Sequence, residues 1–246
     1  MNNNKDITSS IIIIGNEILS GRTQDKNTSA LAKWLNKKGI LVKEVRIIAD
    51  NINEIIYHVR DLKDKFNYVF TTGGIGPTHD DITAEAISVA FDQNYVYHKK
   101  AYQILENFYN KKNFNDGRKK MAKMPEKAKL IPNPKTFAAG FYVQNVFVLP
   151  GVPEILNAMI NELDKIIPNS TEILSISCDL ITKESEIADE LKNIQKNFEK
   201  VVDIGSYPFF NNLNSGTSIV MRSKNQKKLL ECEKIVRKSF SYLLKK

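Results

Sequence analysis

Four consecutive isoleucines, Ile11–Ile14, end at Gly15 and constrain the fold more than any other feature of this chain. An unbroken β-branched run of this length is typical of a parallel strand that is buried on both faces. Residues 41–48 and 68–72 are predicted to form two further strands, and a segment with helical spacing of its apolar residues lies between each pair. This alternation of strands and helices predicts an α/β fold with a parallel sheet, right-handed crossovers and helices on both faces.

The next part of the chain departs from this alternation. Residues 97–135 are basic and predicted to be mainly helical, as an excursion from the sheet whose role the sequence does not assign. Residues 140–149 have the pattern of a β-hairpin, and a helix is expected from Pro153 to about residue 166. Together these segments predict a three-layer αβα domain with a mostly parallel sheet over residues 7–168.

A second, smaller domain is predicted from residue 169 to residue 246. The boundary is indicated by Pro168, Asn169 and Ser170, which follow the last expected helix of the first domain. The pattern beyond them is strand, helix, strand, strand, helix, so we expect a small α+β unit of order βαββα.

The balance of charges gives weak information about partners. The net charge is +8, which is compatible with nucleic acid or with another anionic partner. However, lysine is abundant throughout the chain, and the basic segments have no obvious platform of aromatic residues for stacking bases. Nucleic acid is therefore not the expected partner. No signal-peptide pattern or bilayer-spanning run is found, so we expect a cytoplasmic protein without a membrane partner.

Four predicted loops follow the carboxyl ends of strands, which is where open α/β sheets bind their ligands. These loops are residues 15–22, the turn at Asp50, residues 73–81 and the turn Pro150–Pro153. Glu17 follows the first strand and Asp50 the second, so both carboxylates are candidates for the site, although Glu17 could instead cap a helix or brace its loop. Asp50 also has a purely structural interpretation, because aspartate before a helix is a common N-cap.

The loop at 73–81 is the strongest candidate for a binding site. Gly73, Gly74 and Gly76 allow the backbone to approach a ligand closely. Successive backbone N–H groups before a helix form an anion site, and Thr78 adds a hydroxyl donor. The sequence lacks the patterns of a dinucleotide-binding fingerprint and of a Walker loop.

Asp80 and Asp81 modify this prediction. One of them could be an N-cap for the following helix. Two adjacent carboxylates would repel a bare phosphate, so they favour a ligand that carries a divalent cation or hydrogen-bond donors of its own. The neighbouring His79 is either a general base or a residue that positions the loop.

Several motifs occur in an order that resembles a known family. The chain resembles the MoaB/Mog-type molybdopterin-binding domain, and especially the amino-terminal part of the CinA-like proteins. The matching segments are residues 15–21, 25–27, 50–51, 71–86 and 149–154, with weaker matches at 184–188 and 204–208. Asn16 departs from the family pattern, in which aspartate or threonine is more common.

The resemblance implies a site and a chemistry. Asp81 matches the acidic residue that handles the pterin cofactor, and Asp50 matches a second acid, so both are predicted as catalytic residues and as ligands of a divalent metal such as Mg, Mn or Co. The predicted ligand-binding residues are Gly15, Glu17, Asn27, Thr72, Gly73, Gly74, Gly76, Thr78, Asp80, Pro150 and Gly151.

Three functions remain open from the sequence. The first is a metal-dependent pyrophosphatase that acts on a nucleotide such as ADP-ribose or FAD, as the resemblance implies. The second is a non-catalytic protein that binds or delivers molybdopterin, and the third is a nucleic-acid accessory protein. The resemblance also implies a homo-oligomer. The amidase domain of CinA-like proteins has no counterpart in this chain, so nicotinamide-nucleotide deamidation is not expected.

Overall fold

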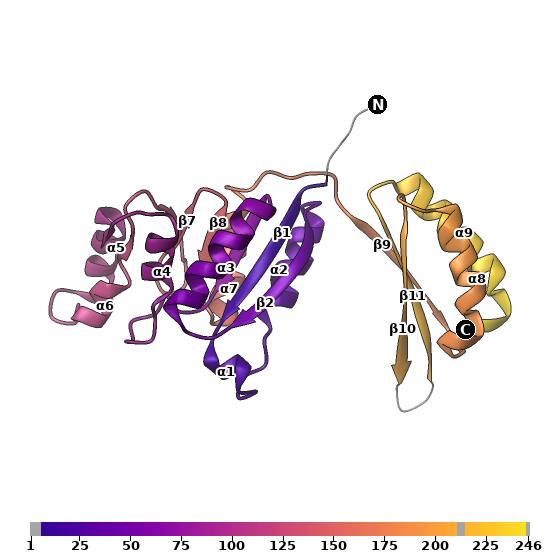
Figure 1. The fold of residues 1–246 in the computed structure, drawn as a ribbon, viewed down its shortest axis with the longest axis horizontal. Helices are drawn as coiled ribbons and strands as arrows, with labels where there is room; N and C mark the ends of the chain where they lie inside the picture. The colour runs from indigo at the N-terminus through magenta and orange to yellow at the C-terminus, as the bar shows by residue number, and fades with distance from the viewer. Residues whose placement is uncertain (1–5, 211–214, 245–246) are drawn as a thin grey trace. The chain divides into compact units, whose positions relative to one another are not determined.

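The computed structural model describes residues 6–210 and 215–244 (Figure 1). Contacts between Cα atoms divide the chain into two compact units, with the main boundary between Ser170 and Thr171 and with Lys37–Gly39 grouped with the second unit. The first unit has two hydrophobic cores, one on each face of its sheet, and the second unit has one.

The first unit is built on a sheet of six strands in the order β2-β1-β3-β8-β7-β6. Strands β2, β1, β3 and β8 are parallel to one another, whereas β7 and β6 run antiparallel to their neighbours. The predicted α/β class with a mostly parallel sheet is confirmed. The strands are β1 (Thr8–Ile14), β2 (Leu41–Ile48), β3 (Tyr68–Thr72), β6 (Lys129–Ile131), β7 (Gly140–Val143) and β8 (Val146–Leu149).

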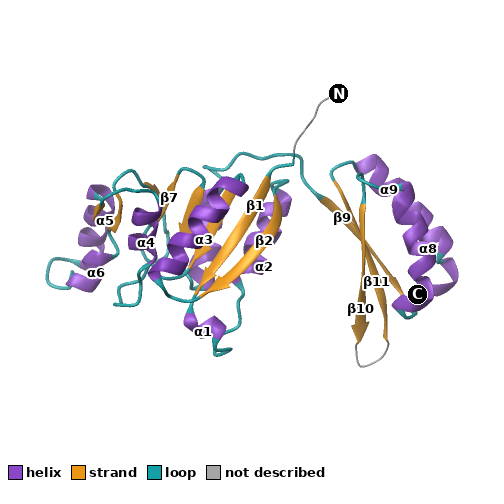
Figure 2. Ribbon diagram, in the orientation of Figure 1, coloured by secondary structure: helices purple, strands orange, loops and turns teal. Residues whose placement is uncertain are grey.

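Helices cover both faces of this sheet (Figure 2). One core contains Ile11 and Ile13 of β1 with α2 (Asn27–Lys37) and α7 (Pro153–Leu163). The opposite core contains Ile12 and Ile14 with α3 (Ile52–Lys65) and α4 (Thr83–Ala90). Because successive side chains of a strand point to opposite faces, the unbroken isoleucine run packs into both cores.

The basic excursion is only partly helical, so its prediction as a mainly helical segment was wrong in part. It contains α5 (Lys99–Tyr109) and the short α6 (Asp116–Lys120). These helices lie in sequence between β4 (Tyr95–Tyr97) and β5 (Lys123–Pro125), which pair antiparallel, and β6 then joins the main sheet. Strands of three residues are too short to show a strand periodicity in the sequence.

The second unit has the predicted order βαββα. Its sheet is antiparallel in the order β10-β11-β9, and its helices contribute to a core that includes Ile187, Ile219 and Val236. The elements are β9 (Leu174–Leu180), α8 (Glu184–Asn197), β10 (Asp203–Phe210), β11 (Ser215–Ser223), α9 (Gln226–Ser239) and a 3₁₀ turn (Ser241–Leu243).

Strand β10 is an edge strand whose backbone is partly protected. The side chain of Gln195 donates to the carbonyl of Val202 at 2.9 Å and accepts from the N–H of Ile204 at 2.8 Å. Pro208 further along the strand has no N–H to offer. These two features limit pairing with another strand along this edge.

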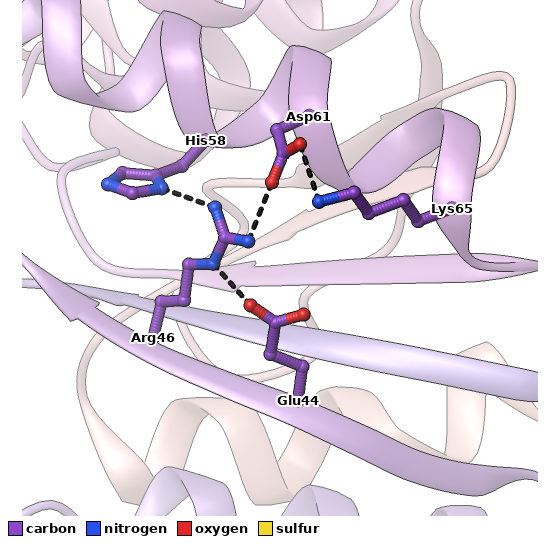
Figure 3. A network of polar contacts seen from close by, with 5 residues as sticks. All are labelled: Glu44, Arg46, His58, Asp61 and Lys65. Atoms are coloured by element: carbon purple, nitrogen blue, oxygen red, sulfur yellow. Dashed lines mark hydrogen bonds and ion pairs between the residues drawn. The ribbon is translucent and has the colours of Figure 1, made fainter.

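A network of charged residues joins the edge strand β2 to α3 (Figure 3). The guanidinium of Arg46 lies at its centre and donates to Glu44 Oε1 and to Asp61 Oδ2, each at 2.6 Å. His58 Nδ1 lies 2.6 Å from Arg46 Nη1, and Lys65 pairs with the other oxygen of Asp61 at 2.7 Å. Because Arg46 can only donate, His58 Nδ1 must accept, which requires the neutral ring.

We expect the first unit to lose stability as His58 becomes protonated. Burial lowers the pKa of His58 from its ordinary value of 6.5, and the charge of Arg46 lowers it further, while Glu44, Glu54 and Asp61 act in the opposite direction. The folded state therefore binds this proton less readily than the unfolded chain, so the free energy of unfolding falls as the pH drops below about 6.5 and stops falling below the folded pKa.

The measurement compares the parent with His58→Gln, which keeps a hydrogen-bond acceptor for Arg46 but does not titrate. The sequence has a single tryptophan, Trp34, which is buried in this unit, so its fluorescence in urea reports the unfolding transition. The variant should show a weaker dependence on pH between about pH 7 and pH 5. Equal pH dependence in both proteins would contradict the assignment to His58.

Candidate functional site

The carboxyl ends of β1, β3 and β8 meet at one edge of the first sheet. The N–H of Gly73 donates to the carbonyl of Leu149 at 3.1 Å, which ties the loop after β3 to the end of β8. A Cβ atom placed on Gly151 would lie 3.2 Å from the Cα of Gly73. Gly15 donates to the carbonyl of Ile48 at 3.2 Å and so ties the end of β1 to β2. The structure therefore brings the predicted loops to a common edge.

The loop after β3 requires glycine at two successive positions. Gly73 has φ +110° and Gly74 has φ +67°, both in the region that residues with side chains rarely adopt. A Cβ on Gly73 would lie 2.1 Å from the carbonyl oxygen of Ile14, and one on Gly74 would lie 2.2 Å from Thr83 Oγ1. Thr83 also donates to the carbonyl of Gly73 at 2.9 Å. The backbone here is thus held close against its surroundings and carries no side chains.

The Asp81 side chain forms hydrogen bonds with another residue of this loop. Its Oδ2 accepts from the backbone N–H of Thr78 at 2.8 Å and from the hydroxyl of Thr78 at 2.5 Å. The N-cap position of α4 is Ile82, with no side-chain cap, so the alternative that Asp80 or Asp81 caps this helix is wrong. The Asp81 carboxylate also lies against Gly76, where a Cβ would approach it to 2.6 Å.

Asp50 joins two strand-end loops instead of capping a helix. The N-cap of α3 is Asn51, whose side chain accepts from the N–H groups of Asn53 and Glu54. Asp50 Oδ2 instead accepts from the N–H of Asn16 at 2.7 Å, so the interpretation of Asp50 as the N-cap is wrong. The turn after β2 is thereby fixed to α1 (Asn16–Leu19), which formed where an irregular loop was expected.

Two more predicted residues lie close to the same backbone. The Glu17 carboxylate folds over Gly15, where a Cβ would lie 2.6 Å from its Oε1. Asn27 is 5% exposed and donates through Nδ2 to the carbonyl of Gly151 at 2.7 Å, which fixes the turn that Pro150 begins. Within the described part of the chain, neither Asn27 Oδ1 nor Thr72 Oγ1 has a hydrogen-bond partner.

The structure adds residues that the sequence did not indicate. Lys120 of α6 and Lys123 of β5 line a small cavity together with Gly76, Asp81 and Tyr95. Burial, with a further contribution from Glu85, raises the pKa of Tyr95 to about 12, so its hydroxyl keeps its proton at neutral pH. No sequence signal pointed to these residues, because they reach the loop only through the folding of the excursion.

Asp50 and Asp81 are the residues available to a metal ion at this edge of the sheet. No group of three or more His, Cys, Asp or Glu side chains is placed to hold a metal within residues 6–210 and 215–244. Asp50 and Asp81 each use Oδ2 in hydrogen bonds, and no described residue bonds their Oδ1 atoms. Mg²⁺ in phosphoryl sites is usually held by one or two carboxylates, substrate phosphates and water, so the Oδ1 atom of either carboxylate is available to such an ion.

Comparisons with known proteins cover both units. Residues 10–169 match the family described as a probable molybdopterin binding domain, and residues 172–243 match the middle domain of FAD synthase. A protein of Archaeoglobus fulgidus is 35% identical over 204 residues, which cover 80% of this chain and 84% of that protein. A protein of Saccharolobus islandicus is 34% identical over 202 residues, which cover 79% and 76% of the two chains.

One similar crystal structure is that of the protein CinA, of unknown function, from Thermoplasma acidophilum. It is 32% identical, has a TM-score of 0.62, and covers 65% of this chain and 97% of its own. Among the described residues, no helix combines the length and the apolar character needed to cross a membrane.

Proposed function

This chain belongs to the molybdopterin-binding domain family, and we propose that its Gly-rich loop binds a phosphorylated pterin or nucleotide and hydrolyses a pyrophosphate bond in it. The observation that carries this proposal is the Gly-rich loop after β3, which is partly or fully exposed from Gly74 onward and lies at a sheet edge beside the Asp81 carboxylate. Backbone without side chains at the end of a parallel strand is suited to close contact with phosphate oxygens.

The second unit supports a nucleotide as the ligand. Its match is to a domain of FAD synthase, and FAD is a dinucleotide joined by a pyrophosphate. A nucleotide of the ADP-ribose or FAD type is therefore a reasonable candidate beside the pterin.

Each residue has a separate task in the proposed hydrolysis. The loop backbone would hold the phosphate, and Thr78 and Asp81 keep that backbone in shape through their mutual hydrogen bonds. A divalent cation bound through Asp50 and Asp81 would polarise the pyrophosphate and lower the pKa of a water molecule. The water oxygen forms a bond to phosphorus, the P–O–P bridge breaks, and ADP-ribose would give AMP and ribose 5-phosphate.

A specific observation also favours a second function, binding without catalysis. Asp50 fastens the turn after β2 to Asn16, and Asp81 fastens the loop to Thr78. Both carboxylates thus have a structural role that would remain if no reaction occurred. In that case the protein would hold or deliver a molybdopterin without changing it.

The two functions separate in one set of measurements. The purified protein is titrated by calorimetry with molybdopterin and with ADP-ribose, and it is then incubated with ADP-ribose or FAD and Mg²⁺, Mn²⁺ or Co²⁺. Hydrolysis of either nucleotide supports the enzyme, whereas tight pterin binding without turnover supports the binding protein. If no phosphorylated compound binds or reacts, both are wrong. Light scattering on the same sample tests the expected homo-oligomer.

A further inference from the structure

We propose that Lys120 binds a phosphate of the ligand at the Gly-rich loop, which gives the basic excursion a role in the site. This inference rests on the proposed function, because it requires a phosphorylated ligand at this loop. It goes beyond that function by assigning the cation that recognises the phosphate.

Helix α6 packs directly against the Gly-rich loop. A Cβ on Gly117 would lie 2.9 Å from the carbonyl oxygen of Pro77, so the backbones of helix and loop are in close contact. Three residues further on, Lys120 Nζ donates to the carbonyl of Thr78 at 2.5 Å. The ammonium group is therefore hydrogen-bonded to the same loop backbone that would contact the phosphate.

The negative charges of the loop make a nearby cation favourable for binding a phosphate. Asp80 and Asp81 are adjacent, and their two negative charges would oppose the approach of a phosphate. Lys120 lines the same small cavity as Asp81. Lys120 offsets that negative charge at the place where the ligand would enter.

Lys120 can bind a phosphate oxygen and keep its hydrogen bond to the loop. An ammonium group has three N–H donors, so it can keep the carbonyl of Thr78 and also donate to a phosphate oxygen. A hydrogen bond between two charged groups is stronger than one to a neutral carbonyl, so a phosphate would be the preferred partner.

The neighbouring lysines have different surroundings. Lys123 lines the same cavity, but its Nζ lies 5.4 Å from the ring centre of Tyr95 and 4.9 Å from that of Tyr97, so two aromatic rings hold it. Lys119 pairs with Asp116 at 2.9 Å within α6. Lys119 is thus a matched control for Lys120, with the same charge at the adjacent position and a different partner.

Calorimetric titration with ADP-ribose tests the proposal, first with Mg²⁺, because the proposed site binds its ligand together with a divalent cation, and then in EDTA, where the contribution of the cation is removed. Lys120→Met should weaken binding by about tenfold or more, which is the usual consequence of losing a hydrogen bond between charged groups. Lys120→Arg should retain most of the affinity, since the charge remains, and Lys119→Met should bind as the parent does.

A second measurement uses the parent protein alone, in case Lys120→Met folds poorly. Limited acetylation followed by mass spectrometry should show that ADP-ribose protects Lys120 and leaves the reactivity of Lys119 unchanged. If the parent binds ADP-ribose but Lys120→Met binds it equally and Lys120 is not protected, the inference is overturned and the proposed function stands. If the parent binds no phosphorylated compound, with or without metal, both are overturned.

Discussion

Gly73→Ala is expected to lower the free energy of unfolding of the first unit by roughly 3 kcal/mol or more, because two costs act together. The alanine would have to adopt φ +110°, and its Cβ would lie 2.1 Å from the carbonyl oxygen of Ile14. That oxygen belongs to the backbone of a buried central strand, so it cannot move away as the end of a flexible side chain could. Ligand binding at the loop should be lost in the same variant.

Gly21→Ala is the matched control for this prediction. Gly21 also has a positive φ, +71°, but nothing lies within 4 Å of a Cβ placed there. It should cost only about 1 kcal/mol, which is the conformational cost of the left-handed region alone. Urea unfolding followed by the fluorescence of Trp34 measures both variants. Equal destabilisation by the two would show that the loop is not held against Ile14.

The overall fold could be predicted because its signals are local. The run Ile11–Ile14 alternates between two cores, so each of its residues had to be apolar, and this pattern is visible without knowing any partner. The short strands β4, β5 and β6 were missed because their pairing depends on contacts across the excursion. Three residues carry too little pattern to reveal such pairing.

The details of the site could be predicted only in part. Glycines before a helix indicated the loop, but the sequence could not decide whether Asp50 or Asn51 caps α3, since both residue types are good caps. The structure gives the cap to Asn51, and Asp50 bonds Asn16, which lies 34 residues away in the sequence. Lys120 reaches Thr78 across 42 residues. Contacts between residues so far apart in the sequence cannot be predicted from local residue patterns.

Asp81→Asn should separate the two roles of this residue, namely its hold on the loop and its proposed part in hydrolysis. An asparagine side-chain oxygen can still accept the hydrogen bonds from Thr78, so the loop should keep its shape. The variant has lost the negative charge, however, and an amide is a much poorer ligand for a divalent cation. We therefore expect hydrolysis of ADP-ribose to fall by a factor of about 100 or more, with nearly unchanged stability.

Asp81→Ala and Thr78→Val complete the comparison. The alanine variant should lose both the activity and about 1–2 kcal/mol of stability, because the N–H of Thr78 loses its acceptor. Thr78→Val keeps the carboxylate and removes one of the two hydrogen bonds to it, so its activity should fall far less than that of Asp81→Asn. Steady-state rates with Mg²⁺ and urea unfolding of the same samples provide the measurements. If Asp81→Asn hydrolyses ADP-ribose as fast as the parent, Asp81 has no part in hydrolysis and only stabilises the shape of the loop. Binding without catalysis then becomes the better account of the site, because its carboxylate would bond the backbone and would not bind a metal ion.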